Sequence, residues 1–235
     1  MDNIAILGDC VEYMKTLPDN AFDLAVVDPV YGDVKKGGYM KNGTTAAIYH
    51  KEYNLALWKQ EKTGQDYFDE LFRVSKNQII WGGNYFTKSI NRDSVCWLVW
   101  DKLRGEGVTF AYCELAWTSF DTSARMFRFM WNGGNMQIHE DRIHPTQKPK
   151  ALYDWIFKKY AKKGDRILDT HLGSGSSRLA AYDAGLDFVG IEINEGYYND
   201  SVKRFNEYIS QQSLFGGYIN DAESFDYYGK IDARS

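Results

Sequence analysis

The tetrapeptide Asp28-Pro29-Val30-Tyr31 combines residue types that suit recognition of a planar amino group. It follows the apolar run 24–27, and open α/β sheets gather their ligands at the carboxyl ends of such runs. The Asp28 carboxylate accepts hydrogen bonds, Pro29 fixes φ and so aims nearby carbonyls, and Tyr31 offers a ring for stacking. The alternative is an ordinary β-turn, because turns strongly favour Asp in the first position with Pro next.

Acceptors placed in this way favour one kind of reaction. An exocyclic amine that is conjugated to a base is a poor nucleophile, because its lone pair is delocalised. Two acceptors on its hydrogens draw the nitrogen toward tetrahedral geometry and localise the lone pair. Attack on a methyl sulfonium requires that state of the amine.

A glycine-rich turn lies between a strand expected at 166–169 and a helix expected at 176–184. Its glycines, Gly173 and Gly175, let the backbone approach a ligand closely. The turn lacks the Gly-Lys-Ser/Thr of a phosphate-binding loop and the third glycine of the dinucleotide fingerprint. About 20 residues further on, a strand ends in Glu192, and an acid at that place typically accepts ribose hydroxyls. An adenosine-like ligand is indicated, the alternative being a tight turn and a solvent-facing Glu192.

These motifs need a frame of strands and helices, and the hydrophobic pattern predicts one. The first elements expected are strand 4–7, helix 11–17 and strand 23–27. The C-terminal half repeats the alternation, with helix 151–160, strand 166–169, helix 176–184, strand 188–193 and helix 197–208. The fold class predicted is therefore α/β, with a mostly parallel, doubly wound sheet.

The midsection is less regular. It predicts helix 66–74 and strands 78–81, 95–100 and 114–118, which would add an antiparallel strand pair to the sheet. Segment 34–62 is rich in Lys and Gly and is expected to be a mobile functional loop, whose charges either meet a phosphate backbone or are merely solvated. Segment 102–143 is a candidate for a small target-recognition insertion, although its aromatics also suit a core. Residues 121–143 and the tail from about 211 stay unassigned.

The composition fits one globular domain over residues 1–235, since 44% of the residues are hydrophobic. With 28 basic and 32 acidic residues the net charge is -4, so any polyanion site must be local. No apolar run approaches the roughly 20 residues of a membrane span and no secretory leader is recognised, so a cytoplasmic protein without a membrane partner is expected. The cysteines are too widely spaced for a disulfide framework, and His139 and His144 lack a third metal ligand, so no metal is expected.

Taken together and in their order, these motifs resemble the amino-group DNA methyltransferases that use S-adenosylmethionine, in the permuted arrangement where the catalytic motif precedes the cofactor motif. The Asp28 turn resembles the family's Asp-Pro-Pro-Tyr motif, and 169–177 resembles its Asp-Pro-Phe-x-Gly-Ser-Gly-Thr-Thr loop. Other matching stretches are 7–10, 81–84, 97–102, 144–149 and 188–192, so that the resemblance spans residues 4 to 208. It implies the Rossmann-like methyltransferase fold.

The resemblance also implies roles by position. Asp28 and the Pro29 carbonyl would hold the target amino group, and Tyr31 would stack on a base flipped out of double-stranded DNA. The residues implied at the cofactor are Asp9 and Cys10 at the adenine, Glu192 at the ribose, Asp169, Gly173, Ser174 and Gly175 in the loop, and Thr146 and Lys148 near the methionine carboxylate.

The activity implied is methylation of N6 of adenine, as in the DNA methyltransferases of restriction-modification systems, because Asp rather than Ser opens the catalytic motif. The alternatives are N4 of cytosine or another planar amino group. Val30 and Thr170-His171 depart from the family pattern, which leaves open a binding module with impaired turnover. A nicotinamide-dependent oxidoreductase would leave the Asp28 turn unexplained. The acidic balance fits either a modest, salt-sensitive DNA affinity or a homodimer that joins two basic surfaces.

Overall fold

The apolar runs of the sequence form the parallel part of one sheet, and its central strands are buried on both faces. The computed structural model of the protein describes residues 2–32, 62–105, 111–132, 135–136 and 140–215. Five parallel strands lie side by side in the order β1 (Asn3–Leu7), β10 (Asp187–Glu192), β9 (Arg166–Asp169), β2 (Phe22–Val27) and β3 (Ser75–Trp81). The predicted fold class is confirmed.

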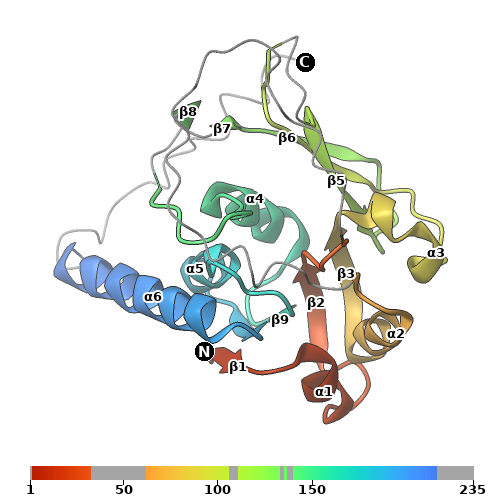
Figure 1. Ribbon diagram of the computed structural model, residues 1–235, viewed down its shortest axis with the longest axis horizontal. Coiled ribbons are helices and arrows are strands. Elements are labelled where there is room, and N and C mark those ends of the chain that lie inside the picture. Colours follow the sequence, from red (N-terminus) through yellow and green to blue (C-terminus); the bar gives the residue numbers. More distant parts are fainter. Residues whose placement is uncertain (1, 33–61, 106–110, 133–134, 137–139, 216–235) are drawn as a thin grey trace.

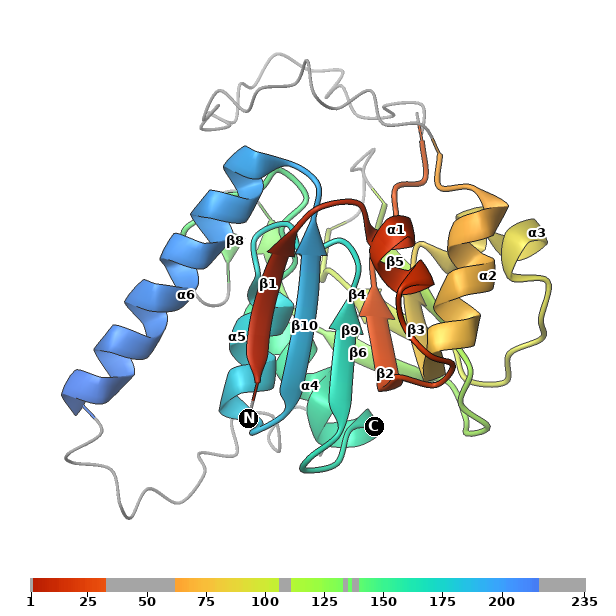
Figure 2. The same cartoon turned by 90° about the horizontal axis from the view of Figure 1, so that it is seen from below.

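Helices cover the two faces of these strands (Figure 1, Figure 2). The helices are α1 (Cys10–Lys15) and α2 (Gln65–Val74) on one face, and α4 (Lys150–Tyr160) and α5 (Ser176–Asp183) on the other, with α6 (Glu195–Phe215) against β1 and α5. Successive residues of β2 alternate between two hydrophobic clusters: Leu24 and Val26 pack in the cluster of α4, and Ala25 and Val27 in that of α2. Burial on both faces explains why the strand reads as an unbroken apolar run.

The midsection extends the sheet beyond β3. Strand β5 (Cys113–Thr118) is antiparallel to both β3 and β4 (Leu98–Asp101), so the expected antiparallel pairing is confirmed. The edge strand β6 (Arg125–Arg128) pairs parallel to β4 and comes from a segment that the pattern left unassigned. The remaining elements are the 3-10 helix η2 (Gly83–Tyr85), α3 (Thr87–Ile90) and the two-stranded sheet of β7 (Trp131–Asn132) and β8 (Asn135–Met136). The predicted loop 34–62 lies, apart from Lys62, outside the described residues.

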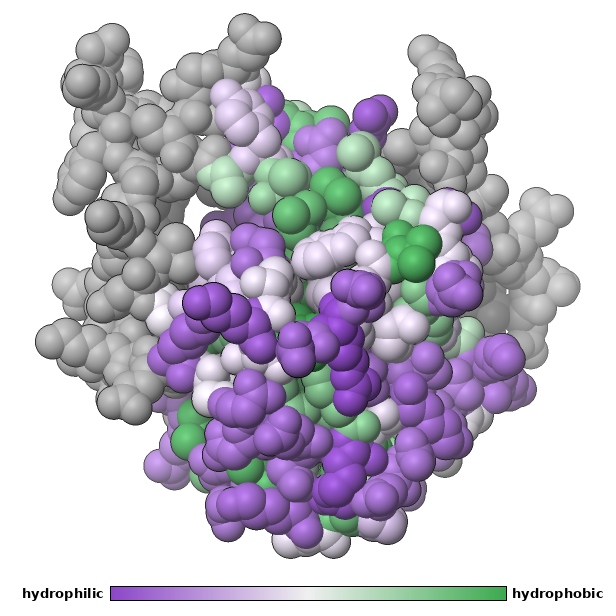
Figure 3. All heavy atoms as spheres, turned by 90° about the vertical axis from the view of Figure 1, so that its right-hand side faces the viewer, coloured by the Kyte–Doolittle hydropathy of each residue, from purple (hydrophilic) through white to green (hydrophobic). Residues whose placement is uncertain are grey.

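The described surface is mostly hydrophilic on the face that carries α3, with hydrophobic residues gathered in its upper part (Figure 3). None of the described helices has the length and apolar character that crossing a bilayer requires. Within the same residues, no group of three His, Cys, Asp or Glu side chains is placed to hold a metal ion, and the three cysteines are free thiols. His139 lies outside the described residues.

Strands β9 and β2 form the switch point of the sheet. From β2 the chain proceeds outward to β3, and from β9 it proceeds outward to β10 on the other side. The two connections therefore diverge at the carboxyl ends of this strand pair, and open α/β sheets bind their ligands in the crevice expected there. The Asp28 turn follows β2 and the glycine-rich turn follows β9, so both motifs meet at that crevice.

Gly190 lets the glycine-rich turn pack onto β10. A Cβ at this position would lie 2.7 Å from Leu172 Cδ1 and 2.8 Å from Phe188 Cε1. Both neighbours are buried, so neither side chain can move into solvent. Leu172 belongs to the turn itself, and strand and turn are coupled through this contact.

We expect Gly190→Ala to lower the free energy of unfolding by about 1–3 kcal/mol, because the added methyl overpacks the contact with Leu172. The matched control is Gly105→Ala, since a Cβ on Gly105 meets nothing within 4 Å. Urea unfolding of the two variants measures the difference. Equal stabilities of the two variants would contradict the packing argument.

Candidate active site

Four strands deliver the predicted site residues to one edge of the sheet. Asp28 follows β2, Asp169 ends β9, Glu192 ends β10, and Asp9 follows β1 after one residue. Because these strands are parallel, their carboxyl ends coincide. Three carboxylates that the resemblance implies at the cofactor thus lie at the same sheet edge as Asp28 of the predicted catalytic turn.

Asp28 is a largely buried carboxylate with one oxygen engaged. Its Oδ2 accepts a hydrogen bond from Lys148 Nζ, whereas Oδ1 is buried and accepts no hydrogen bond from the described residues. Burial raises the pKa of Asp28, and the charge of Lys148 opposes that rise. Pro29, the next residue, is buried as well. The turn therefore holds an acceptor that a polar hydrogen of a ligand would satisfy.

Lys148 reaches the Asp28 turn rather than the glycine-rich turn. Its side chain is 5% exposed, and its Nζ also lies 3.3 Å from Glu114 Oε2 on β5. Glu114 in turn contacts Lys102. Sequence reasoning did not single out Glu114 or Lys102 as functional. The one signal that could have found Glu114 is a charged residue beside the apolar run of an interior strand.

Tyr31 stacks on Tyr85 of the 3-10 helix, with ring centroids 4.8 Å apart and an interplanar angle of 18°. This stack requires Gly82, whose φ is +66° and whose Cβ would lie 2.9 Å from Tyr31 Cδ1. Gly83 is constrained as well, because a Cβ there would lie 2.8 Å from Trp117 N. Gly82 therefore leaves room for the ring of Tyr31, on which the charge of Asp28 acts, and Gly83 leaves room for Trp117.

The glycine-rich turn is tied to the end of β10 by Glu192. Gly173 N donates to Glu192 Oε2 at 2.8 Å, and Asn194 N donates to Oε1 at 2.9 Å. Gly173 and Gly175 have φ values of +52° and +73°, a region that favours glycine. Burial raises the pKa of Glu192, while these backbone donors oppose the rise. Carboxylate and turn consequently hold each other in place.

The end of β10 also fits a nucleoside. Leu7 pairs in register with Glu192 and is 44% exposed, and Ile193, which follows Glu192, is 60% exposed. An acidic acceptor between exposed apolar side chains matches the chemistry of adenosine, whose ribose hydroxyls donate and whose base is planar and apolar on its faces. Sequence reasoning named Leu7 only as part of the matching stretch 7–10, and it did not single out Ile193, which only completed a strand pattern.

Asp169 is a buried carboxylate under the turn. It accepts hydrogen bonds from Ser177 Oγ and from His171 N, the latter at 3.0 Å. Burial raises its pKa to about 6. Thr170 and His171, which depart from the family pattern, both contact Tyr67. Thr170 Oγ1 lies 2.6 Å from Tyr67 Oη, and the His171 ring packs edge-on against the Tyr67 ring with centroids 5.4 Å apart. Burial lowers the pKa of His171 to about 4, so the imidazole is a neutral ring at pH 7.

The other predicted cofactor residues lie at the rim. Asp9 caps α1, since its Oδ1 accepts from Val11 N and Glu12 N at 2.8 and 3.0 Å. Cys10 begins that helix, and burial raises the pKa of its thiol to about 12. Thr146 is exposed, and its hydroxyl lies 3.2 Å from His144 Nδ1.

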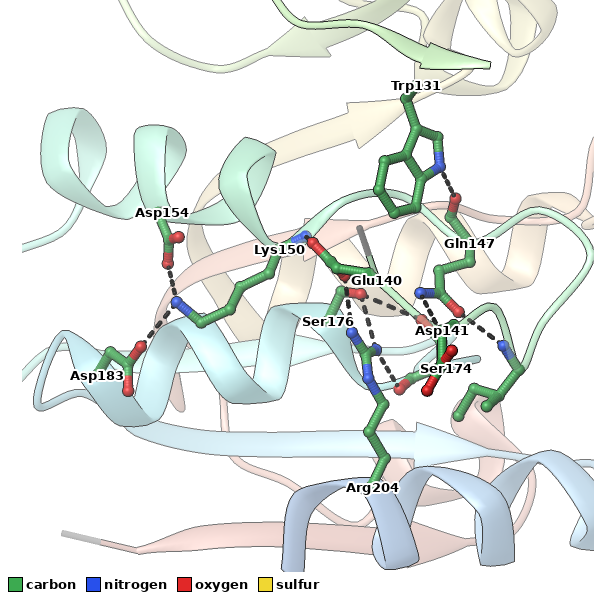
Figure 4. Close-up of polar contacts among 11 residues, drawn as sticks. Trp131, Glu140, Asp141, Gln147, Lys150, Asp154, Ser174, Ser176, Asp183 and Arg204 are labelled. Carbon is green, nitrogen blue, oxygen red and sulfur yellow. Dashed lines mark hydrogen bonds and ion pairs between the residues drawn. The ribbon is translucent and has the colours of Figure 1, made fainter. Parts of the chain in front are cut away.

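A polar network holds the back of the glycine-rich turn (Figure 4). Arg204 on α6 donates to Ser174 O at 2.9 Å and to Ser176 Oγ at 3.0 Å. Its second terminal nitrogen donates to Glu140 at 2.9 Å, and Glu140 accepts from Lys150 N at the start of α4. Arg204 thereby links the turn to α6 and, through Glu140, to the start of α4.

Comparisons with known proteins connect this geometry to DNA modification. A family model described as DNA methylase, of the N6/N4 amino-methyltransferase type, matches residues 35–203. The chain is 24% identical to the type II methyltransferase M.HinfI of Haemophilus influenzae over an alignment of 253 positions, gaps included. The alignment covers 87% of this chain and 68% of that protein. The match to the family model begins after the Asp28 turn.

Two solved structures show that the fold is shared. The complex of M1.HpyAVI with S-adenosylmethionine superposes with a TM-score of 0.56 at 17% identity and covers 86% of this chain and 98% of that one. The cytosine-N4-specific PvuII DNA methyltransferase superposes with a TM-score of 0.60 at 13% identity, over 87% of this chain and 86% of that one.

The buried charge of Asp169 predicts a pH-dependent stability difference. A raised pKa means that this group favours folding below its ordinary value of 3.8 and that the contribution is lost as the pH rises through about 6. Asp169→Asn is neutral at every pH. We therefore expect the stability of this variant relative to wild type to rise by roughly 1–3 kcal/mol between about pH 4 and pH 8.

Thermal or urea unfolding of both proteins across that pH range measures the difference. A hydrogen bond that is lost in the variant changes its free energy of unfolding by the same amount at every pH. This change therefore cancels when the stability differences at two pH values are compared. A stability difference that does not change with pH would contradict the assignment of a raised pKa to Asp169.

Proposed function

We propose that this chain, which belongs to the DNA methylase family of N6/N4 amino-methyltransferases, transfers the methyl group of S-adenosylmethionine to N6 of adenine in double-stranded DNA. The observation that carries the proposal is the buried Oδ1 of Asp28 at the switch point of the sheet, which accepts no hydrogen bond from the described part of the chain. An amine of a base placed there would donate one hydrogen to Oδ1. The carbonyl of Pro29 follows directly in the chain and would take the second hydrogen.

The cofactor side of the crevice suits S-adenosylmethionine. Glu192 would accept the ribose hydroxyls, the exposed side chains of Leu7 and Ile193 would contact the adenine, and the turn around Gly173 would admit the methionine part. The bound cofactor supplies an electrophilic methyl group on a sulfonium. Asp28 withdraws the amine hydrogens toward itself and so raises the electron density on the attacking nitrogen.

The target side of the crevice suits a planar base. Tyr31 offers a ring that Tyr85 already supports from one side, so that a base stacked on Tyr31 would meet a surface of fixed orientation. A base inside a duplex cannot reach such a position, and the proposal therefore includes flipping of the target nucleotide. Segment 102–143 would read the DNA sequence; its edge strand β6 exposes Arg125, Met126 and Arg128.

N4 of cytosine is the second candidate target. Its exocyclic amine offers the same two hydrogens to Asp28, and one of the solved structures that share the fold is a cytosine-N4-specific enzyme. Asp in the first position of the motif favours adenine, because the motif of the family's cytosine branch opens with Ser.

The proposal predicts that Asp28→Ala abolishes methyl transfer and leaves cofactor binding intact. Removing the acceptor leaves the amine lone pair delocalised, and we expect a rate loss of at least about 100-fold. Transfer of labelled methyl from S-adenosylmethionine to unmethylated duplex DNA measures the rate, and calorimetry measures the cofactor affinity. A variant that binds S-adenosylmethionine as wild type does and still transfers at the wild-type rate would sink the assignment of Asp28.

A further inference from the structure

Four charged side chains form a row behind the Asp28 turn. Lys148 contacts Asp28 on one side, and its Nζ lies 3.3 Å from Glu114 Oε2 on the other. Glu114 also contacts Lys102, which follows β4. The side chains of Lys148 and Lys102 are only 5% and 13% exposed. The row therefore alternates in sign inside the protein, from the carboxylate at the crevice to the ammonium of Lys102.

Each member of this row depends on its neighbours. A buried ammonium loses its hydration and is tolerated only where carboxylates compensate that loss. Lys148 Nζ divides its donors between Asp28 and Glu114, while the indole ring of Trp81 lies 5.7 Å from it. Glu114 therefore restrains Lys148, and Lys148 restrains Asp28.

We infer that Lys148 and Glu114 are positioning residues for methyl transfer: Lys148 holds Asp28 as a carboxylate with Oδ2 engaged, and Glu114 holds Lys148 against Asp28. This inference rests on the proposed function. Its consequence is that the two oxygens of Asp28 have different roles. Oδ2 accepts a hydrogen bond from Lys148, and Oδ1 remains as the acceptor for the amine.

The electrostatics of the row agree with this role. Burial raises the pKa of Asp28, Lys148 lowers it, and Glu114 raises it again. Burial also acts to raise the pKa of Glu114, but Lys148 and Lys102 lower it to about 2, so Glu114 stays charged. The other titratable groups that interact with Asp28 are Lys102, Tyr31, Tyr67, Tyr153 and Asp169.

Loss of Lys148 would place two carboxylates next to each other. Among the described residues, Lys102 is a second cation whose charge acts on Asp28, and it is already engaged by Glu114. Asp28 would take up a proton and offer the amine a carboxylic acid in place of a carboxylate. A position near the methionine carboxylate, which the resemblance implies for Lys148, has a different consequence: loss of Lys148 would then weaken cofactor binding.

The test is the pH dependence of single-turnover methyl transfer by Lys148→Met, with S-adenosylmethionine affinity measured in parallel. On the acidic side of the profile the rate rises with pH as Asp28 ionises, and we call this rise the acid limb. We expect its midpoint to lie about 1–3 pH units higher in Lys148→Met, because Asp28 has lost its cation. The rate deficit should therefore shrink toward alkaline pH. We expect the dissociation constant for S-adenosylmethionine to change by less than about 3-fold, because Lys148 does not contact the cofactor in this account.

A second variant separates positioning from folding. Lys148→Met combined with Glu114→Gln removes the carboxylate that repels Asp28, so its acid limb should return toward that of wild type. Lys150→Met is the matched control, because Lys150 also forms ion pairs, with Asp154 and Asp183, away from Asp28. Its acid limb should coincide with that of wild type.

The outcomes are distinct. An unshifted acid limb in Lys148→Met, or a loss of cofactor affinity greater than 10-fold, would overturn the inference while leaving the proposed function intact. Absence of transfer by wild type would count against the proposed function instead. In that event the pKa of Asp28 can be measured without turnover, from the Cγ resonance of Asp28 in carbon-13-labelled protein. The resonance is identified by its loss in Asp28→Asn. An unchanged pKa of Asp28 in Lys148→Met would contradict the inference.

Discussion

The proposed site depends on keeping the Asp28 carboxylate charged although its side chain is largely buried. A buried carboxylate takes up a proton unless a cation or several donors compensate its charge. At the end of β2 this compensation comes from Lys148, which the chain delivers from the segment before α4, 120 residues away. The meeting of β2 and β9 at the switch point makes this contact possible, because it brings the two halves of the chain together at one sheet edge.

The remaining features of the site suit the two ligands of the proposed reaction. The turn after β9 is locked by Glu192 at its front and by Arg204 at its back, so that its backbone is preorganised. The ring of Tyr31 is fixed by Tyr85 and by the absence of a side chain on Gly82. Donor and acceptor of a methyl group can be aligned only if both walls are rigid.

Much of this architecture could be predicted from the sequence, for a physical reason. Parallel strands that are buried on both faces have continuous apolar sequences, so strands 23–27 and 166–169 could be recognised. The motifs at the ends of these strands could be recognised for the same reason. Strand β6 was not, because only one of its four residues is buried and its pattern lacks alternation. Two aromatic residues of the midsection, Phe127 and Phe129, lie in the hydrophobic core, which was the alternative to a role in target recognition.

The partners of the charged residues were beyond the reach of sequence patterns. The place of Lys148 depends on Glu114 and Asp28, which come from distant segments that only the folded sheet brings together. From the sequence, the departure at Thr170-His171 left impaired turnover open as an alternative; in the fold, Tyr67 on α2 provides partners for both side chains. Spacing along the chain cannot reveal such compensation.

If Asp28 holds the amine of adenine, the protein methylates N6 of adenine in duplex DNA. Nucleoside analysis by mass spectrometry of unmethylated duplex DNA, after incubation with the protein and S-adenosylmethionine, shows which amine is methylated. We expect N6-methyladenine, and we expect it to be absent after a parallel incubation with Asp28→Ala. N4-methylcytosine in its place, or no methylated nucleoside from a protein that binds S-adenosylmethionine, would rule out adenine N6 as the target.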